Sequence, residues 1–129
     1  LALTGIEVRT AADAREAARA LAAMGPRHVV IKGGHAGTDP VIDVVYDRDA
    51  DSFFELAYAR VPGTSTHGTG CTFSAAIAAH LAQGRSAPAA VEAARAYLQV
   101  ALERAPGLGR GHGPLGHLPL GRAGSATPD

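Results

Sequence analysis

The chain has 129 residues, with 12 basic and 12 acidic side chains, so its formal net charge is zero. The chain therefore has no excess of positive charge to attract nucleic acid, and it has no acidic run that suggests a tail. Its length allows one domain at most. No apolar run reaches the roughly 18 residues that a membrane-crossing helix needs. The single cysteine excludes an internal disulfide and favours a reducing compartment. We therefore expect a cytoplasmic protein without nucleic-acid or membrane partners.

The first half of the chain predicts one helix followed by strands. Thr10 is a candidate N-cap with Asp13 as its capping-box partner, and small apolar residues at helical spacing predict a helix over 11–24. Apolar stretches rich in β-branched and aromatic residues then predict strands at 28–32, 41–46 and 52–59. The last of these strands is expected near an edge of the sheet.

The second half predicts two helices, one over 69–82 and one from Ser86 to about Arg104. On the first of them, a face of small residues suits close packing and comprises Cys71, Ala75, Ala78 and Ala79. Residues 121–129 are predicted to form a disordered tail. The order α-β-β-β-α-α gives a thin sheet, which indicates part of a larger α/β protein.

Gly68, Thr69 and Gly70 stand where a loop becomes a helix. The N–H groups of a first helical turn have no intrahelical partner and carry the positive end of the helix dipole. Glycines let the backbone approach an anion closely, so this corner predicts a phosphate cradle. Such a cradle would stabilise the charge on a phosphoryl group during its transfer. The segment is not a Walker A loop, because it lacks the Gly-Lys-Ser/Thr ending.

Cys71 occupies the first turn of the same helix, whose positive end favours the thiolate form of a cysteine. A thiolate there would accept the proton of a substrate hydroxyl that attacks phosphorus, or it would act as a covalent nucleophile. The alternative is a small buried residue that packs the start of the helix. The residues alone leave these readings open.

Lys32 directly follows a predicted strand and is a second candidate for phosphate contact. A lysine at the carboxyl end of a strand in an α/β sheet faces the crevice where ligands bind, and its ammonium pairs with phosphate. The alternative is a lysine whose head group simply reaches solvent. His67, in the loop before the second helix, would contact phosphate or substrate, or would be solvated.

Four other polar residues have weaker cases. Asp39 and Asp43 would lie near a nucleotide or metal, or they would serve as turn and strand-face residues. His112 and His117 flank a Gly-Pro pair without further metal-ligand residues, and we expect them to have roles in turns.

Three segments resemble the hydroxymethylpyrimidine/phosphomethylpyrimidine kinases of thiamine biosynthesis. They are VVIKGGH at 29–35, STHGTGCTFSAAIAAHLAQG at 65–84 and GHGPLGH at 111–117. The opening ALTG at 2–5 is similar to the stretch that follows the Asn-x-x-Glu motif of that family, so the resemblance runs from about 2 to 118. The HGTGC motif is quite specific. Most ribokinase-fold kinases have Gly-x-Gly-Asp there, with the aspartate as catalytic base, whereas a cysteine in its place marks the pyrimidine kinases and some related pyridoxal kinases.

The resemblance implies a ribokinase-like α/β/α sandwich, with residues 1–120 as the C-terminal, ATP-binding half of the kinase domain. It also implies phosphoryl transfer from ATP, with Mg²⁺, to hydroxymethylpyrimidine and then to its monophosphate. By resemblance, Cys71 corresponds to the catalytic residue, and the anion hole to Gly68, Thr69 and Gly70. Nucleotide contacts would come from Lys32, Gly34 and Thr69, and His67 would lie near the substrate.

The family's chain is longer, and its Asn-x-x-Glu motif, which helps place Mg²⁺, has no counterpart in this sequence. We therefore expect no metal ligands in the chain, and expect most of the substrate pocket to belong to a longer parent. Two alternatives stay open, a pyridoxal kinase of the same fold and a truncated, non-catalytic module that needs a partner chain. Self-association into a homo-oligomer is also considered.

Overall fold

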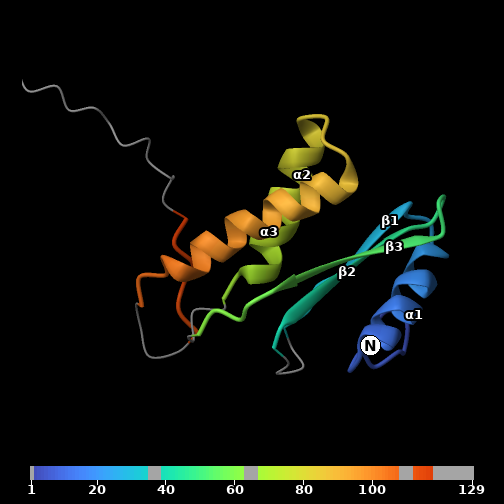
Figure 1. Cartoon of the computed structure of the whole chain (residues 1–129), viewed down its shortest axis with the longest axis horizontal. Coiled ribbons are helices and arrows are strands. Elements are labelled where there is room, and N and C mark those ends of the chain that lie inside the picture. The colour runs from blue at the N-terminus through green and yellow to red at the C-terminus, as the bar shows by residue number, and fades with distance from the viewer. Residues whose placement is uncertain (1, 35–38, 63–66, 108–111, 118–129) are drawn as a thin grey trace, which may run out of the picture.

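The computed structural model describes residues 2–34, 39–62, 67–107 and 112–117. Within them, the elements follow in the predicted order, α1 (Ala11–Ala22), β1 (His28–Ile31), β2 (Val41–Asp47), β3 (Ser52–Tyr58), α2 (Thr69–Ala82) and α3 (Ala87–Glu103). Figure 1 shows α1 beside one end of the sheet, and α2 and α3 together near the other end. The α/β architecture predicted from the sequence is therefore confirmed.

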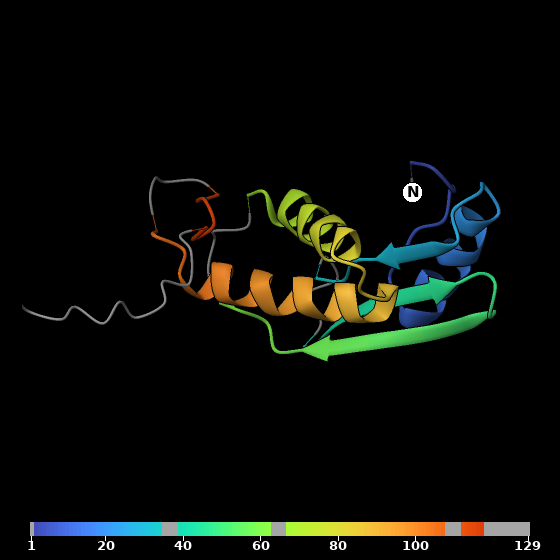
Figure 2. The same cartoon turned by 90° about the horizontal axis from the view of Figure 1, so that it is seen from above.

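The strands form one antiparallel sheet in the order β1-β2-β3, with β2 buried at its centre. Val45 of β2 lies opposite Val30 of β1 and Phe54 of β3. Because side chains alternate along a strand, Val45 packs on the α2–α3 side, while Tyr46 packs on the α1 side. The sheet thus separates two small cores, and the view in Figure 2 shows the helices on its two faces.

Helix α1 begins at the predicted capping box. The Thr10 hydroxyl accepts a hydrogen bond from the Asp13 N–H at 3.2 Å, and the Asp13 carboxylate accepts one from the Thr10 N–H at 2.8 Å. These reciprocal bonds satisfy backbone donors that the first turn leaves open. The helix buries the predicted small-residue face, Ala14, Ala17, Ala18 and Ala22. It ends before the predicted Met24, and Gly25 then takes a φ of 133° that favours glycine.

Helices α2 and α3 form the larger core together with the sheet. This core contains Val45, Phe73, Val91, Ala94, Leu98, Ala101 and Leu115. The prediction that the small-residue face of α2 packs closely is wrong, since Cys71, Ala75, Ala78 and Ala79 are exposed. Phe73, with Ala76 and Ile77 beside it, faces the core instead. The physical reason is area, because burying phenylalanine and isoleucine removes more apolar surface from water than burying alanine.

The segment 112–117 lies against the end of α3. The Gly116 N–H donates to the Ala101 carbonyl at 2.8 Å, and a Cβ at this glycine would overlap the Arg104 carbonyl. Leu115 is buried in the core, and the ring of His117 stacks with Tyr97 at 6.4 Å between centroids. His117 therefore belongs to a packed segment that contacts α3.

None of the helices among the described residues is both long and apolar enough to span a bilayer. The predicted tail, 121–129, lies outside the described residues.

Candidate active site

The predicted phosphate cradle lies at the N-terminal end of α2. Gly68 is its N-cap residue, with a left-handed φ of 82° that side-chain-bearing residues rarely adopt. The first intrahelical hydrogen bond runs from the Thr72 N–H to the Gly68 carbonyl at 2.8 Å. The N–H groups of residues 69–71 precede this bond, so they lie at the open, positive end of the helix. A Cβ built on Gly68 or Gly70 meets no described atom within 4 Å.

Cys71 is exposed in the first turn of α2. The alternative reading, a buried residue that packs the start of the helix, is therefore wrong for this structure. The hydroxyl of Ser74, one turn later, donates to the carbonyls of Gly70 and Cys71 at 3.0 and 3.1 Å. These bonds occupy the carbonyl side of the first turn and leave its N–H side for a ligand.

The Cys71 side chain also lines a cavity of about 560 Å³ between α2, α3 and the segment 112–117. Its other lining residues are Thr72, Ala75, Ala76, Ala79, His80, Tyr97 and His117. The small residues of α2 leave room here, and the Tyr97 hydroxyl lies 3.3 Å from Nδ1 of His117 at the opposite wall. A mostly apolar cavity with a few polar groups, of this size and beside an anion site, suits a small organic ligand.

The second candidate, Lys32, follows β1 and begins a turn that several backbone contacts hold. The Gly33 N–H donates to Oδ1 of Asp43 at 2.8 Å, and the Lys32 ammonium donates to the Gly33 carbonyl at 3.2 Å. Gly34 has a φ of 104°, and its carbonyl accepts from the Arg60 guanidinium at 3.1 Å. The turn that presents Lys32 is thus held by Asp43 of β2 and by Arg60, which follows β3.

Burial, and to a smaller extent the positive charge of Arg95, lower the pKa of Lys32. The lysine lines a cavity of about 610 Å³ under the start of α1, whereas Cys71 lines the other cavity. The crevice rule that pointed to Lys32 concerns parallel sheets, and this sheet is antiparallel. The position of Lys32 comes from the glycine turn and from Asp43 rather than from that rule.

Asp43 has a larger role than the predicted strand-face residue. It is fully buried, and its carboxylate contacts Gly33, Tyr58 and Arg95. We call these four residues the Asp43 network. Arg95 and Tyr58 were not among the site residues predicted from the sequence. A signal for Arg95 was present, because it shares the buried face of α3 with Val91 and Leu98 at helical spacing.

The remaining candidates lie at the surface. His67 is exposed and directly precedes the Gly68 cap. Asp39 is exposed as well, and its carboxylate accepts from the Arg60 N–H at 3.4 Å, which agrees with the turn role considered for it. Among the residues that the structure describes, no cluster of three or more His, Cys, Asp or Glu side chains is arranged to hold a metal ion.

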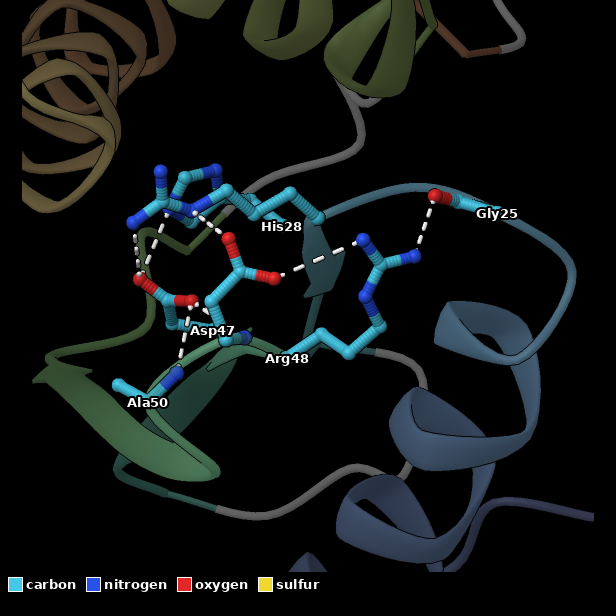
Figure 3. A network of polar contacts seen from close by, with 7 residues as sticks. Gly25, His28, Asp47, Arg48 and Ala50 are labelled. Carbon is cyan, nitrogen blue, oxygen red and sulfur yellow. Dashed lines mark hydrogen bonds and ion pairs between the residues drawn. The ribbon is translucent and has the colours of Figure 1, made fainter.

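A second polar network lies at the other end of β2, where the chain turns into β3 (Figure 3). Asp47 is at its centre, with Oδ2 3.2 Å from Nε2 of His28 and Oδ1 accepting from the Asp49 N–H at 2.9 Å. Arg48 donates to the Gly25 carbonyl at 2.6 Å, which ties the turn to the segment between α1 and β1. We call this set the Asp47 network. It joins neighbouring turns and includes no candidate site residue.

With this geometry established, comparison with known proteins identifies the family. Residues 1–116 match the family model described as phosphomethylpyrimidine kinase. The chain belongs to the phosphomethylpyrimidine kinase family. It is 39% identical to the hydroxymethylpyrimidine/phosphomethylpyrimidine kinase of Bacillus subtilis, over 93% of this chain and 44% of that protein. It is 44% identical to the kinase of the same name from Streptomyces coelicolor, over 89% of this chain and 42% of that protein.

The chain is also 42% identical to the thiamine biosynthesis bifunctional protein ThiED of Geobacter sulfurreducens, over 90% of this chain and 23% of that protein. It therefore spans less than half the length of the relatives that it matches.

Solved structures confirm the expected ribokinase-like fold. The pyridoxal kinase of Staphylococcus aureus in complex with AMP-PCP and pyridoxal is 33% identical, with a TM-score of 0.84, over 90% of this chain and 43% of that one. The pyridoxal kinase of Bacillus subtilis in an ADP complex is 36% identical, with a TM-score of 0.79, over 86% of this chain and 41% of that one. Both structures contain a nucleotide or a nucleotide analogue.

Proposed function

We propose that this chain supplies the ATP-binding and proton-accepting half of a kinase that phosphorylates hydroxymethylpyrimidine and its monophosphate. The observation that carries the proposal is the start of α2, where the exposed Cys71 shares a first turn with open backbone N–H groups behind Gly68. Membership of the phosphomethylpyrimidine kinase family supports the same reaction. Because the chain spans less than half of its relatives, the activity is that of the whole polypeptide.

In this proposal, the backbone of Gly68, Thr69 and Gly70 forms the anion hole for the moving phosphoryl group. N–H groups at a helix N-terminus are preorganised for the negative charge on its equatorial oxygens, so they stabilise the transition state without reorganising. Cys71 acts as the general base that accepts the proton of the substrate hydroxyl while the hydroxyl oxygen bonds to phosphorus and ADP leaves. His67, which is exposed and directly precedes the cap, would contact the substrate.

The nucleotide would contact the start of α2 and the Lys32 ammonium. Lys32 would pair with the phosphates of ATP, with Gly34 and Thr69 contributing backbone contacts. Burial lowers the pKa of Lys32, so a phosphate beside it would restore favourable surroundings for the ammonium. The apolar cavity beside Cys71, with the Tyr97 and His117 rings on its wall, suits the nucleotide base.

Mg²⁺ is the expected companion of ATP, and the described residues contain no group of three or more His, Cys, Asp or Glu side chains arranged to hold a metal ion. Mg²⁺ in kinases is commonly held by one or two carboxylates together with the substrate phosphates. Asp43, the carboxylate nearest to the Lys32 turn, is fully buried and engaged with Arg95. We therefore assign no step of the reaction to a metal held by this chain.

The named relatives favour a pyrimidine as the substrate. The relatives named as hydroxymethylpyrimidine/phosphomethylpyrimidine kinases are 39% and 44% identical to this chain. A pyridoxal kinase is the second candidate, supported by the solved pyridoxal kinases at 33% and 36% identity. Both substrates carry a hydroxymethyl group on an aromatic ring, so the same base and anion hole would serve either.

We expect the activity in the cytoplasm, because an exposed catalytic thiol needs a reducing compartment to persist. Cell fractionation with a specific antibody would measure this location.

The test uses the full-length polypeptide that contains this chain, with ATP labelled in its γ-phosphate. We expect label to pass to hydroxymethylpyrimidine with a higher kcat/KM than to pyridoxal. The opposite preference would select the pyridoxal kinase reading. Transfer to neither acceptor by a folded protein would overturn the kinase proposal in favour of a non-catalytic module.

A further inference from the structure

Asp43 is a buried charge whose partners come from elements far apart in the chain. It is 0% exposed at the α2–α3 side of the sheet. Its Oδ1 accepts hydrogen bonds from the Gly33 N–H at 2.8 Å and from the Tyr58 hydroxyl at 3.0 Å. Its Oδ2 accepts from Nε of Arg95 at 2.7 Å and also from an Nη of the same guanidinium. The carboxylate thereby joins the turn after β1, the end of β3 and helix α3.

Arg95 extends this connection to α2. Its guanidinium carbon lies 4.0 Å from the ring centroid of Tyr58 and 4.4 Å from that of Phe73. Phe73 is two residues beyond Cys71 in the first turns of α2. A planar guanidinium that stacks on aromatic rings and binds a carboxylate through two nitrogens has one favourable orientation. The position of α2 is therefore coupled, through Arg95 and Asp43, to the turn that presents Lys32.

We propose that Asp43 and Arg95 are positioning residues that hold the Lys32–Gly34 turn and the start of α2 in register for ATP. This inference rests on the proposed function, in which Lys32 and the anion hole contact the same nucleotide. The turn has little freedom of its own, since a Cβ at Gly33 would overlap the Ile42 carbonyl. The Asp43 network then fixes this closely packed turn relative to Phe73.

Stability alone explains such a pair poorly. Two charges lose their hydration when they are buried, and apolar residues of similar volume often stabilise a core equally well. Arg95 is 7% exposed and Asp43 is 0% exposed, so both lose nearly all of their hydration. What the charged pair adds is a fixed direction for several hydrogen bonds, and one of these bonds ends on the backbone of the Lys32 turn.

The charges of Asp43 and Arg95 also act on Lys32. Besides burial, the charge of Arg95 lowers the pKa of Lys32 and the charge of Asp43 acts in the opposite direction. Arg60, whose guanidinium binds the Gly34 carbonyl, is a further positive charge that lowers the pKa of Lys32. Loss of the Asp43–Arg95 pair would therefore change the position of the Lys32 ammonium and the electrostatic potential around it. This is the ammonium that we propose to contact the phosphates of ATP.

The test compares Arg95→Lys with Arg15→Lys in the full-length polypeptide. Lysine keeps the charge of Arg95 but loses the two-nitrogen contact and the planar stacking. Arg15 is a matched control on the other face of the sheet, because it binds one carboxylate oxygen of Glu55 through two nitrogens, at 3.0 and 2.5 Å, and lies over Phe53. We expect Arg95→Lys to raise the KM for ATP by roughly tenfold or more and to change the KM for the phosphate acceptor less than about twofold. Arg15→Lys is expected to change neither KM.

An unchanged KM for ATP in folded Arg95→Lys would overturn the inference, as would equal increases in both KM values. Tyr58→Phe is the second variant, because it keeps the ion pair and the ring and removes one hydrogen bond to Asp43. It is expected to raise the KM for ATP about two- to fivefold, a hydrogen-bond-sized effect. An unchanged KM in this variant would also contradict the inference. A wild-type polypeptide without kinase activity would instead reject the proposed function itself.

Discussion

Asp43 and Asp47 lie on the same face of β2, since they are four positions apart, yet their surroundings differ completely. Asp43 is fully buried and binds Arg95, 52 residues later in the chain. The Asp47 side chain is 25% exposed and binds its own turn and the neighbouring His28. The same residue type thus links distant elements at one end of the strand and stabilises a local turn at the other.

The difference follows from what each aspartate can reach. Asp47 accepts from the N–H groups of Asp49 and Ala50, a local pattern that aspartate commonly forms at the start of a turn. Asp43 lies between Ile42 and Val44 inside the central strand, where the backbone N–H groups of β2 pair with the neighbouring strands. Its charge needs a partner from another element, and Arg95 supplies it. We therefore connect the Asp43 end with the proposed nucleotide site and the Asp47 end with local stability only.

Breaking the ion pair at the buried end should have the largest effect on stability. Arg95→Met leaves the Asp43 charge buried without its cation, and we expect a loss of about 3–5 kcal/mol in the free energy of unfolding. Urea unfolding of the full-length polypeptide measures this loss. The double variant with Asp43→Asn should recover most of it, because the uncompensated charge is gone. A loss below about 1 kcal/mol in Arg95→Met would show that the pair is not strongly coupled.

The Gly33 backbone gives the next largest effect. Gly33→Ala places a Cβ against the Ile42 carbonyl, and we expect overpacking to lower the free energy of unfolding by about 1–3 kcal/mol. Gly70→Ala is the matched control for stability, since its Cβ meets no described atom within 4 Å. It should be neutral or slightly stabilising, because alanine is the better helix former. Equal losses in the two variants would contradict the close packing of the Lys32 turn.

The pH dependence of ATP binding tests the electrostatic role proposed for Lys32. Burial, with Arg95 second, lowers the pKa of Lys32, so its ammonium loses its proton at a lower pH than an ordinary lysine. Affinity for ATP should be full below the lowered pKa and should fall as the pH rises through it. Lys32→Arg should remove this alkaline decrease, because arginine stays charged. The same alkaline decrease in wild type and Lys32→Arg would exclude Lys32 as its source.

The smallest effect on stability is expected for substitution of Asp47, at the partly exposed end of β2. Burial alone would raise the pKa of Asp47, but hydrogen bonds from the Ala50 N–H and Arg27 outweigh it and lower the pKa. Its contribution to stability is therefore present above the unfolded pKa of about 3.9 and is lost as the pH falls through the lower folded value. Asp47→Asn should destabilise slightly at neutral pH, less so at high salt, and leave the KM for ATP unchanged. A clear rise in that KM would remove the functional distinction between the two ends.

The sequence predicts local features of this molecule better than long-range ones. Thr10 and Asp13 predict the start of α1 because a capping box is local, and Gly68 predicts the start of α2 for the same reason. The spacing of Val91, Arg95 and Leu98 also indicates that Arg95 faces the core. Its partner was not predictable from spacing, because only the folded sheet brings Asp43 to α3.

The small-residue face of α2 shows another limit of sequence reasoning. Cys71 and the alanines suit close packing, but two faces of the helix were apolar and only one packs on the core. The face with Phe73 and Ile77 packs on the core because these side chains bury more apolar area than cysteine and alanine do. The exposed face then leaves Cys71 beside a cavity. The catalytic role of Cys71 still comes from its chemistry and from the family resemblance, and it stays a prediction.

The most direct test of the account is therefore single-turnover phosphoryl transfer by Cys71→Ala in the full-length polypeptide, with saturating ATP and hydroxymethylpyrimidine. Ser74→Ala, one turn later on the same helix, is the control. We predict that Cys71→Ala lowers the transfer rate by about 10²–10⁴-fold, the usual contribution of a general base, while binding of a non-hydrolysable ATP analogue stays within about twofold. Transfer by Cys71→Ala at the wild-type rate would contradict the central claim.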